Sequence, residues 1–481
     1  MTYWIIALLL LSTTYTVNAQ NEADSLNHYM ELAARNNSQL KSEFSVYKAS
    51  MEKVPQAGAY SDPELSMDLY LSPMESFGGK QTANISIMQM FPWFGSRSAA
   101  RSEATEMARM SYEKFREARN NIYFEVKRQW YQLSNLYDQL RNTKANIALL
   151  DQLERLSVNR FSAASIQGVG KVSSSPAKVA SASSPPASGG MSGMGGGMSA
   201  TASAPTSASK GMGGMGGMGD SGMGSSKGMG GMSDILRIQL EKTELEDKLL
   251  SILSNIKSAE AQFNALLSRP HSTTVVVPDS LMQRVYLMDE KATFDSIANN
   301  NPMLTMLVAE SNSFRAKAKM DRKMSYPMFG VGVEYTIMGK SQSPMVMPSM
   351  NGKDMIMPMF KITLPLFRGK YSAQQRESKY YREASNFKYT NTLNQLEAQY
   401  IEAKQQMDDA ARKIELYTRQ YELSISTFRM MTREFSAGSA SLTDVIQIER
   451  QMLDYRFKKS EAVATYNTAV ASIERLTSTS F

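Results

Sequence analysis

Residues 435–446 read Phe-Ser-Ala-Gly-Ser-Ala-Ser-Leu-Thr-Asp-Val-Ile, and both ends of this stretch occur a second time earlier in the chain. The first three residues recur at Phe161–Ala163, 274 positions earlier, whereas Asp444–Ile446 resembles Asp234–Leu236, 210 positions earlier. Similarity at a fixed offset indicates an internal repeat. The change of offset predicts that about 64 residues are inserted into the first copy, between Ala163 and Asp234.

The repeat extends over most of the chain. Asn36–Leu40 resembles Asn300–Leu304, and Phe91–Gly95 resembles Leu364–Gly369. In each copy a helical segment leads to a proline, then to two alternating segments, and then to a long helical segment. We therefore expect a single protomer over residues 20–481, made of two repeats over residues 24–269 and 290–478.

Four segments alternate between apolar and polar residues, which predicts β-strands with one apolar and one wet face. They are Glu64–Leu71, Thr82–Met90, Met328–Ile337 and Ile356–Leu364. The same pattern is typical of strands in a soluble sandwich. If the strands face lipid instead, several chains have to contribute to one closed barrel, because only closure removes the exposed strand edges.

A long helix is predicted after the first strand pair. Residues from Ser96 to Phe161 include no proline or glycine, and an unbroken helix over them would be roughly 100 Å long. Apolar residues such as Val126, Trp130 and Leu133 recur at steps of three and four. Narrow apolar stripes on long helices indicate coiled-coil-like packing. A soluble helical bundle explains these stripes, but it does not explain strand pairs at matching points of both copies.

Composition restricts the function classes. Residues 1–19 have the pattern of a signal peptide, with a short apolar run and small residues before Gln20. The chain has no cysteine, which excludes thiolate chemistry, and its two histidines argue against a histidine metal centre. Its 53 basic and 46 acidic residues are interspersed, unlike the clustered basic surface of a nucleic-acid binder. We find no constellation typical of an enzyme.

Two copies of a long helical hairpin with an inserted strand pair resemble the TolC-type outer-membrane factor family, over roughly residues 24–477. The resemblance implies an α+β membrane protein in the outer membrane that extends into the periplasm. Long antiparallel helical hairpins would form an α-barrel, and four strands per chain would join a 12-stranded barrel in a homotrimer. It also implies a periplasmic adaptor and an inner-membrane transporter as partners.

Residues 435–446 resemble the periplasmic tip of that family, where a glycine-containing turn reverses one helix into the next. The resemblance places adaptor contacts at the tip, for which we select Gly438, Ser439, Ala440 and Leu442. It also implies acidic residues lining an aperture, at Asp444 and, through the repeat, at Asp234. The alternative is that each aspartate caps the helix that follows it. Gln447 stands where some members have a second acid.

The insertion, over residues 166–233, is rich in Gly, Ser, Ala and Met, and this composition predicts disorder. Thioether sulfur is a soft, neutral ligand suited to Cu(I) and Ag(I). The candidate metal ligands are Met191, Met194, Met198, Met212, Met215, Met218, Met223, Met229 and Met232. A second group of methionines, between Met338 and Met359, lies in the second strand pair. Against this stands the high methionine content of the whole chain and the use of Met as a gap filler.

The resemblance implies an exit duct for efflux that needs no cofactor, and the methionines indicate heavy-metal cations such as Cu(I) or Ag(I) as its cargo. Two alternatives stay open at this point. The same duct would serve for drugs or polypeptides, or the chain is a periplasmic metal-binding helical protein without a pore.

Overall fold

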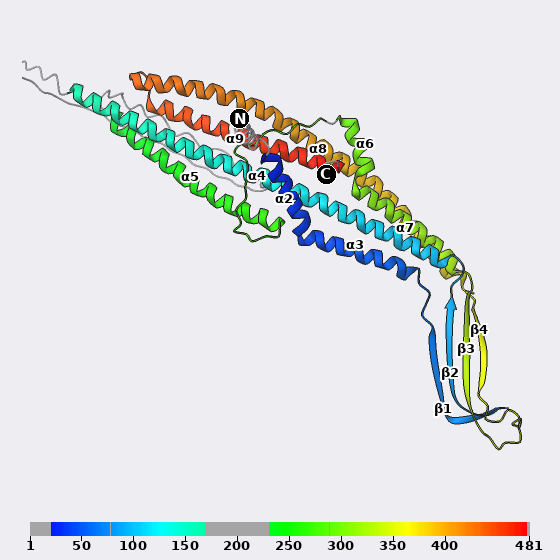
Figure 1. The fold of residues 1–481 in the computed structure, drawn as a ribbon. Coiled ribbons are helices and arrows are strands. Elements are labelled where there is room, and N and C mark those ends of the chain that lie inside the picture. The colour runs from blue at the N-terminus through cyan, green and yellow to red at the C-terminus, as the bar shows by residue number, and fades with distance from the viewer. Residues whose placement is uncertain (1–20, 77, 169–229, 288, 479–481) are drawn as a thin grey trace, which may run out of the picture.

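The structure, a computed structural model, describes residues 21–76, 78–168, 230–287 and 289–478. Its elements run through the same order twice: two helices, two strands, then two long helices (Figure 1). The first series is α2 (Asn21–Asn36), α3 (Ser38–Ala57), β1 (Glu64–Ser76), β2 (Gly79–Phe91), α4 (Ser96–Gly168) and α5 (Gly230–Leu266). The second is α6 (Glu290–Asn300), α7 (Pro302–Met324), β3 (Met328–Gly339), β4 (Met355–Thr363), α8 (Arg368–Ala437) and α9 (Leu442–Thr477).

The four strands form one antiparallel sheet in the order β1-β2-β3-β4, so the two hairpins meet along β2 and β3. Each hairpin ends just before a proline, Pro92 or Pro365, which has no amide hydrogen for a further ladder bond. The alternating pattern predicted strands that are too short in the first hairpin. β1 continues beyond Leu71 to Ser76, and β2 begins at Gly79 instead of Thr82. A register shift between Leu69 and Met74 breaks the alternation there, which is why the pattern ended early.

The register sorts the side chains onto two faces. Leu65 pairs with Ile87, which pairs with Val333, so these three apolar residues share one face. One position along, Ser66 pairs with Ser86 and Ser86 with Glu334 on the opposite face. Over β1, β2 and β3 the sheet therefore has an apolar face and a face with polar residues.

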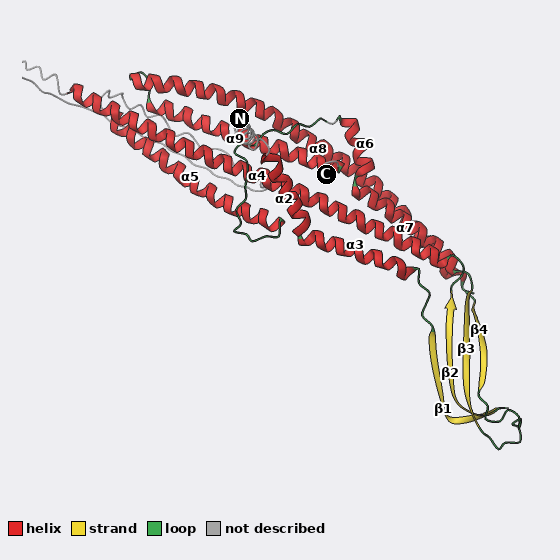
Figure 2. Ribbon diagram, in the orientation of Figure 1, coloured by secondary structure: helices red, strands yellow, loops and turns green. Residues whose placement is uncertain are grey.

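The long helices α4 and α8 comprise 73 and 70 residues, or about 105–110 Å at 1.5 Å per residue. Near the sheet α4 packs against α3 and α7, and farther away it packs against α5 and α9. The described residues form three separate apolar clusters along this length, around Val126, Tyr400 and Val445. Figure 2 shows the result, an elongated helical body with the sheet at one end.

The ends of the insertion differ from the prediction. Helix α4 continues through Gly168 and α5 begins at Gly230, so residues 166–168 and 230–233 are helical and not disordered. The interior of the insertion and the expected signal peptide lie outside the described residues. Among the helices that the structure describes, none combines the length and the apolar composition needed to cross a membrane.

Two equivalent asparagines join the short helices of each repeat to its last helix. Asn37 accepts a hydrogen bond from the Leu40 amide (3.1 Å), and its Nδ2 donates to the Leu266 carbonyl (2.8 Å). Asn301 accepts from the Met303 amide (2.9 Å), and its Nδ2 donates to the Leu476 carbonyl (2.9 Å). Each asparagine thus caps the N-terminus of one helix and satisfies a carbonyl near the C-terminus of another.

We expect Asn301→Ala to lower the free energy of unfolding by about 2 kcal/mol, because it removes a cap and leaves a buried carbonyl without its donor. The control is Asn300→Ala, at an exposed neighbour whose bond to Ser296 lies on the surface. Its expected effect is below about 0.5 kcal/mol. Thermal unfolding followed by circular dichroism compares the two variants. Equal shifts of Tm would contradict the proposal that Asn301 stabilises the contact between two helices.

Candidate functional site

The helical end farthest from the sheet contains the turn between α8 and α9. Gly438 has φ of +87°, a conformation that favours glycine, and it ends α8. Its amide donates to the Phe435 carbonyl (3.0 Å), and the Ser439 amide donates to the Glu434 carbonyl (2.9 Å). These bonds satisfy the last carbonyls of α8 and allow the chain to reverse within four residues.

The structure divides the four residues that we expected at an adaptor contact. Gly438 and Ser439 are exposed, and Ala440 is half-buried. Leu442 is 1% exposed and belongs to the apolar cluster of Phe435 and Val445, so its side chain supports the turn from inside. The prediction of a surface contact is therefore wrong for Leu442. The corresponding turn of the first repeat lies outside the described residues.

Neither aspartate predicted at the aperture is a helix cap. Ser441 is the N-cap of α9, where its hydroxyl accepts a hydrogen bond from the Thr443 amide (3.2 Å), and exposed Asp444 follows in the first turn. Helix α5 begins at Gly230, so half-buried Asp234 also lies inside a helix. The capping alternative is thereby removed for both. Their placement at the aperture stays a prediction.

Side chains connect the beginnings of α5 and α9. Arg237 donates a hydrogen bond to the Thr443 hydroxyl. Two turns farther along, Arg450 Nε lies 2.7 and 2.8 Å from the two carboxylate oxygens of Glu241, and its Nη2 lies 3.3 Å from Glu244. These contacts join the α4–α5 hairpin to the α8–α9 hairpin beside Asp234 and Asp444, and sequence analysis had not singled out any of them.

A buried carboxyl group lies beside these contacts. Glu449 of α9 is fully buried, and its Oε1 accepts a hydrogen bond from Asn146 of α4. Its Oε2 has no partner among the described residues. Burial raises the pKa of Glu449 to about 8, with a further contribution from the negative charge of Glu241 and an opposing one from Arg450. The carboxyl group is therefore neutral in the folded protein below that pH.

A group that binds its proton more tightly in the folded chain destabilises that chain as the pH rises from its ordinary pKa to its raised one. For Glu449 this interval runs from about 4.5 to about 8. We expect the difference in stability between Glu449→Gln and the wild type to be small near pH 5, within about half a pH unit of the start of this interval. At pH 8 we expect the variant to be more stable, by at most about 1.4 kcal/mol per pH unit of the interval.

The measurement is thermal unfolding of both proteins at pH 5 and pH 8. Glu244→Gln, at an exposed carboxylate of the same helix pair, is the control and should leave the pH dependence unchanged. A pH dependence that Glu449→Gln does not reduce would show that Glu449 is ionised in the folded protein.

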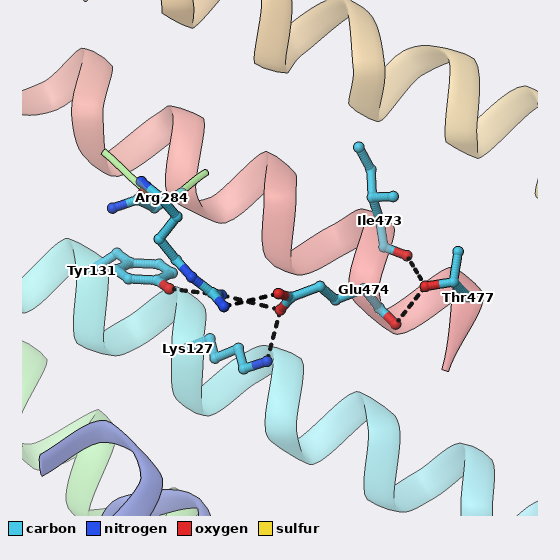
Figure 3. A network of polar contacts seen from close by, with 7 residues as sticks. Lys127, Tyr131, Arg284, Ile473, Glu474 and Thr477 are labelled. Atoms are coloured by element: carbon cyan, nitrogen blue, oxygen red, sulfur yellow. Dashed lines mark hydrogen bonds and ion pairs between the residues drawn. The ribbon is translucent and has the colours of Figure 1, made fainter. Parts of the chain in front are cut away.

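A second polar network lies midway along the helices, where α4, α9 and the segment between α5 and α6 meet (Figure 3). Glu474 of α9 binds Lys127 of α4 (Nζ–Oε2 2.8 Å) and Arg284 of the connecting segment (Nη2–Oε1 2.9 Å). Arg284 Nη1 also donates to the hydroxyl of Tyr131 (3.4 Å). Burial lowers the pKa of Lys127, and the adjacent Glu474 opposes this shift.

Removal of one partner of a buried ion pair costs more than removal of both. We expect Glu474→Ala to lower the free energy of unfolding by about 3–5 kcal/mol, because it leaves Lys127, which is 5% exposed, without this carboxylate. The double variant Lys127→Met/Glu474→Ala should recover part of the loss. Chemical denaturation of the two single variants and the double variant measures the coupling. Strictly additive losses would contradict it.

The candidate metal ligands fall mostly outside the described residues. Of the nine, Met232 is described, and it lies in the first turn of α5 with 59% of its side chain exposed. Within the described parts of the chain, no group of three or more His, Cys, Asp or Glu side chains is placed to hold a metal ion. Met338, near the end of β3, is buried, whereas Met345, Met347 and Met350, between β3 and β4, are exposed.

Comparison with known proteins agrees with this architecture. Residues 294–479 match a family model described as outer membrane efflux protein. The solved outer-membrane channel OprN is 12% identical, with a TM-score of 0.66, over 94% of this chain and 90% of that chain. VceC of Vibrio cholerae is 14% identical, with a TM-score of 0.63, over 94% of this chain and 95% of that chain. CusC is 10% identical, with a TM-score of 0.64, over 94% of this chain and 92% of that chain.

No curated protein matches the chain. The predicted fold class is confirmed: long helical hairpins with four antiparallel strands, as in the solved outer-membrane channels that the chain resembles. The expectation that the chain is not an enzyme agrees with the description of the matched family model, outer membrane efflux protein.

Proposed function

We propose that this chain belongs to the TolC-type outer-membrane efflux family and forms a homotrimeric exit duct that carries soft metal cations out of the cell. Its partners would be a periplasmic adaptor and an inner-membrane transporter. The sheet would lie in the outer membrane and the helices would extend into the periplasm. Transport would be driven by the partners, with no chemistry performed by the chain itself.

The observation that carries this proposal is the apolar face of the sheet. Large apolar side chains of this face are mostly exposed: Leu69, Phe360 and Leu65 are 70%, 79% and 67% exposed. Contiguous apolar surface of this kind marks a membrane or protein interface. The opposite face carries Ser66, Ser86 and Glu334, which suits a water-filled interior. This arrangement also argues against a periplasmic helical protein without a pore.

The edges of the sheet support assembly from several chains. Strands β1 and β4 each pair on one side, so each offers a free row of backbone donors and acceptors. In lipid such an edge is costly, and pairing of β4 with β1 of the next chain removes it. Three chains would give a closed set of twelve strands, a number within the range of outer-membrane barrels.

The helices supply a matching surface for neighbouring chains. On α8, which packs against α7 and α9, several large apolar side chains are exposed. Phe387 and Leu423 are each 69% exposed, and Tyr380 is 65% exposed. Large exposed apolar residues along a helix of about 105 Å are expected where helices of adjacent protomers pack.

The choice of soft cations as cargo rests on ligand chemistry. Thioether sulfur binds Cu(I) and Ag(I) without losing a proton, and the chain contains 36 methionines and no cysteine. Nine of the methionines lie within residues 166–233, the part of the sequence that joins α4 to α5. Export of drugs or polypeptides would not require a high methionine content.

The test is copper and silver tolerance in a host that lacks the gene. The host is complemented with the full-length protein or with a variant in which a short linker replaces residues 169–229, so that α4 and α5 stay intact. We expect the full-length protein to restore tolerance and the deletion variant to restore less of it. Equal amounts of both proteins in the outer-membrane fraction are the required control.

Equal rescue by both proteins would assign the insertion no part in metal capture while leaving metal export in place. Failure of both to change metal tolerance, while both reach the outer membrane, would overturn the metal cargo. Sensitivity to antimicrobial compounds in the same strains would then test the drug alternative.

A further inference from the structure

The polar face of the sheet carries a group of methionines. The alternating pattern predicts solvent-facing residues at these positions. Met88 and Met90 of β2 and Met359 of β4 flank two glycines of the strand between them, Gly330 and Gly332. Met90 pairs with Gly330, whereas Met88 and Met359 pair with Gly332 from opposite sides. All three methionines are half-buried. Three thioethers therefore meet on one small area of a face that is otherwise polar.

The glycines bring the sulfur atoms together. Sδ of Met90 lies 2.6 Å, and Sδ of Met88 lies 3.5 Å, from the point that a Cβ atom would occupy on Gly330. At Gly332 the corresponding point lies 3.4 Å from the terminal methyl carbon of Met359. A side chain at Gly330 would occupy the space that the Met90 sulfur fills, whereas a side chain at Gly332 would first meet the Ile87 carbonyl oxygen, 2.6 Å from its Cβ position. Two sulfur atoms thus lie over one glycine, and the third methionine reaches the next.

The charged side chains around this group of methionines favour binding of a cation. Glu64 pairs with Met88 on the β1 side, and Glu334 lies on the same face one step beyond Gly332. Lys361, paired with Gly330, brings one positive charge. Two carboxylates against one ammonium group leave a net negative charge near the thioethers, which favours cations over anions.

We propose that Met88, Met90 and Met359 form a binding site for a soft monovalent metal ion, with Ag(I) or Cu(I) as its ligand class. Neutral thioethers select such ions over Zn²⁺ or Mg²⁺, which prefer nitrogen, thiolate or oxygen donors. Three rotatable bonds let each methionine turn its sulfur toward a shared ion. The statement that the site lines the duct rests on the proposed function, whereas the binding itself does not.

Methionines also fill packing gaps, and an experiment separates the two roles. A bound ion engages the sulfur lone pair that hydrogen peroxide attacks to form the sulfoxide. The purified full-length protein is titrated with Ag(I) and exposed to peroxide, and peptide mass spectrometry follows the oxidation of each methionine. Controls are Met67, on the opposite face of the same sheet, and Met51 of α3, both exposed.

We expect Met88, Met90 and Met359 to be half-protected at a free Ag(I) concentration at least tenfold lower than Met67 and Met51. Because no ligand has to lose a proton, the difference should persist from pH 5 to pH 7.5. Met88→Leu/Met90→Leu keeps the apolar volume and should remove the early protection of Met359. Protection of the three residues in parallel with the controls, or early protection of Met359 in the double variant, would overturn the site.

The outcome is independent of the tolerance experiment. Early protection without any effect on metal tolerance would leave the site in place and refute the metal cargo. Restored tolerance without early protection would retain the cargo and refute the site.

Discussion

The constraint on which this structure depends is the sheet with one apolar face and two unpaired edges. A single chain cannot satisfy it, because the apolar face needs lipid or protein and each edge needs a partner strand. The helices follow from this requirement. Both hairpins end at prolines and pass directly into helices of 73 and 70 residues. A closed ring of strands would thus continue into a ring of helices of about 105 Å.

Helices of this length have no single core to hold them in register. The apolar contacts of the described residues fall into three clusters. Ion pairs and hydrogen bonds connect the two helical hairpins in addition to these clusters. Glu474 joins α4, α9 and the connecting segment near the middle, and Arg450 joins α9 to α5 near the turn. Glu449 adds a neutral, buried carboxyl group beside Arg450. The hairpins are therefore joined at separate points along their length.

The duplication, the four strands and the long helices were predictable from sequence, because each depends on a local pattern or on self-similarity. Asn37 and Asn301 fall within the matched segments, yet their role depends on carbonyls of Leu266 and Leu476, far away in the chain. Glu449 reads as an ordinary helical residue, since its burial depends on packing against α4. The N-cap at Ser441 was readable: Ser441-Leu-Thr-Asp444 has the spacing of a capping motif.

Closure of the sheet by three chains is the central claim, and the absence of native cysteine allows a direct test. Lys361→Cys in β4 is combined in turn with Glu64→Cys, Ser66→Cys or Asp68→Cys in β1, and the protein is oxidised in the outer membrane. Denaturing electrophoresis without reductant then counts the linked chains. Our account predicts, for at least one pair, a ladder that ends at three chains. A ladder that continues beyond three, or monomers for every pair, would contradict it.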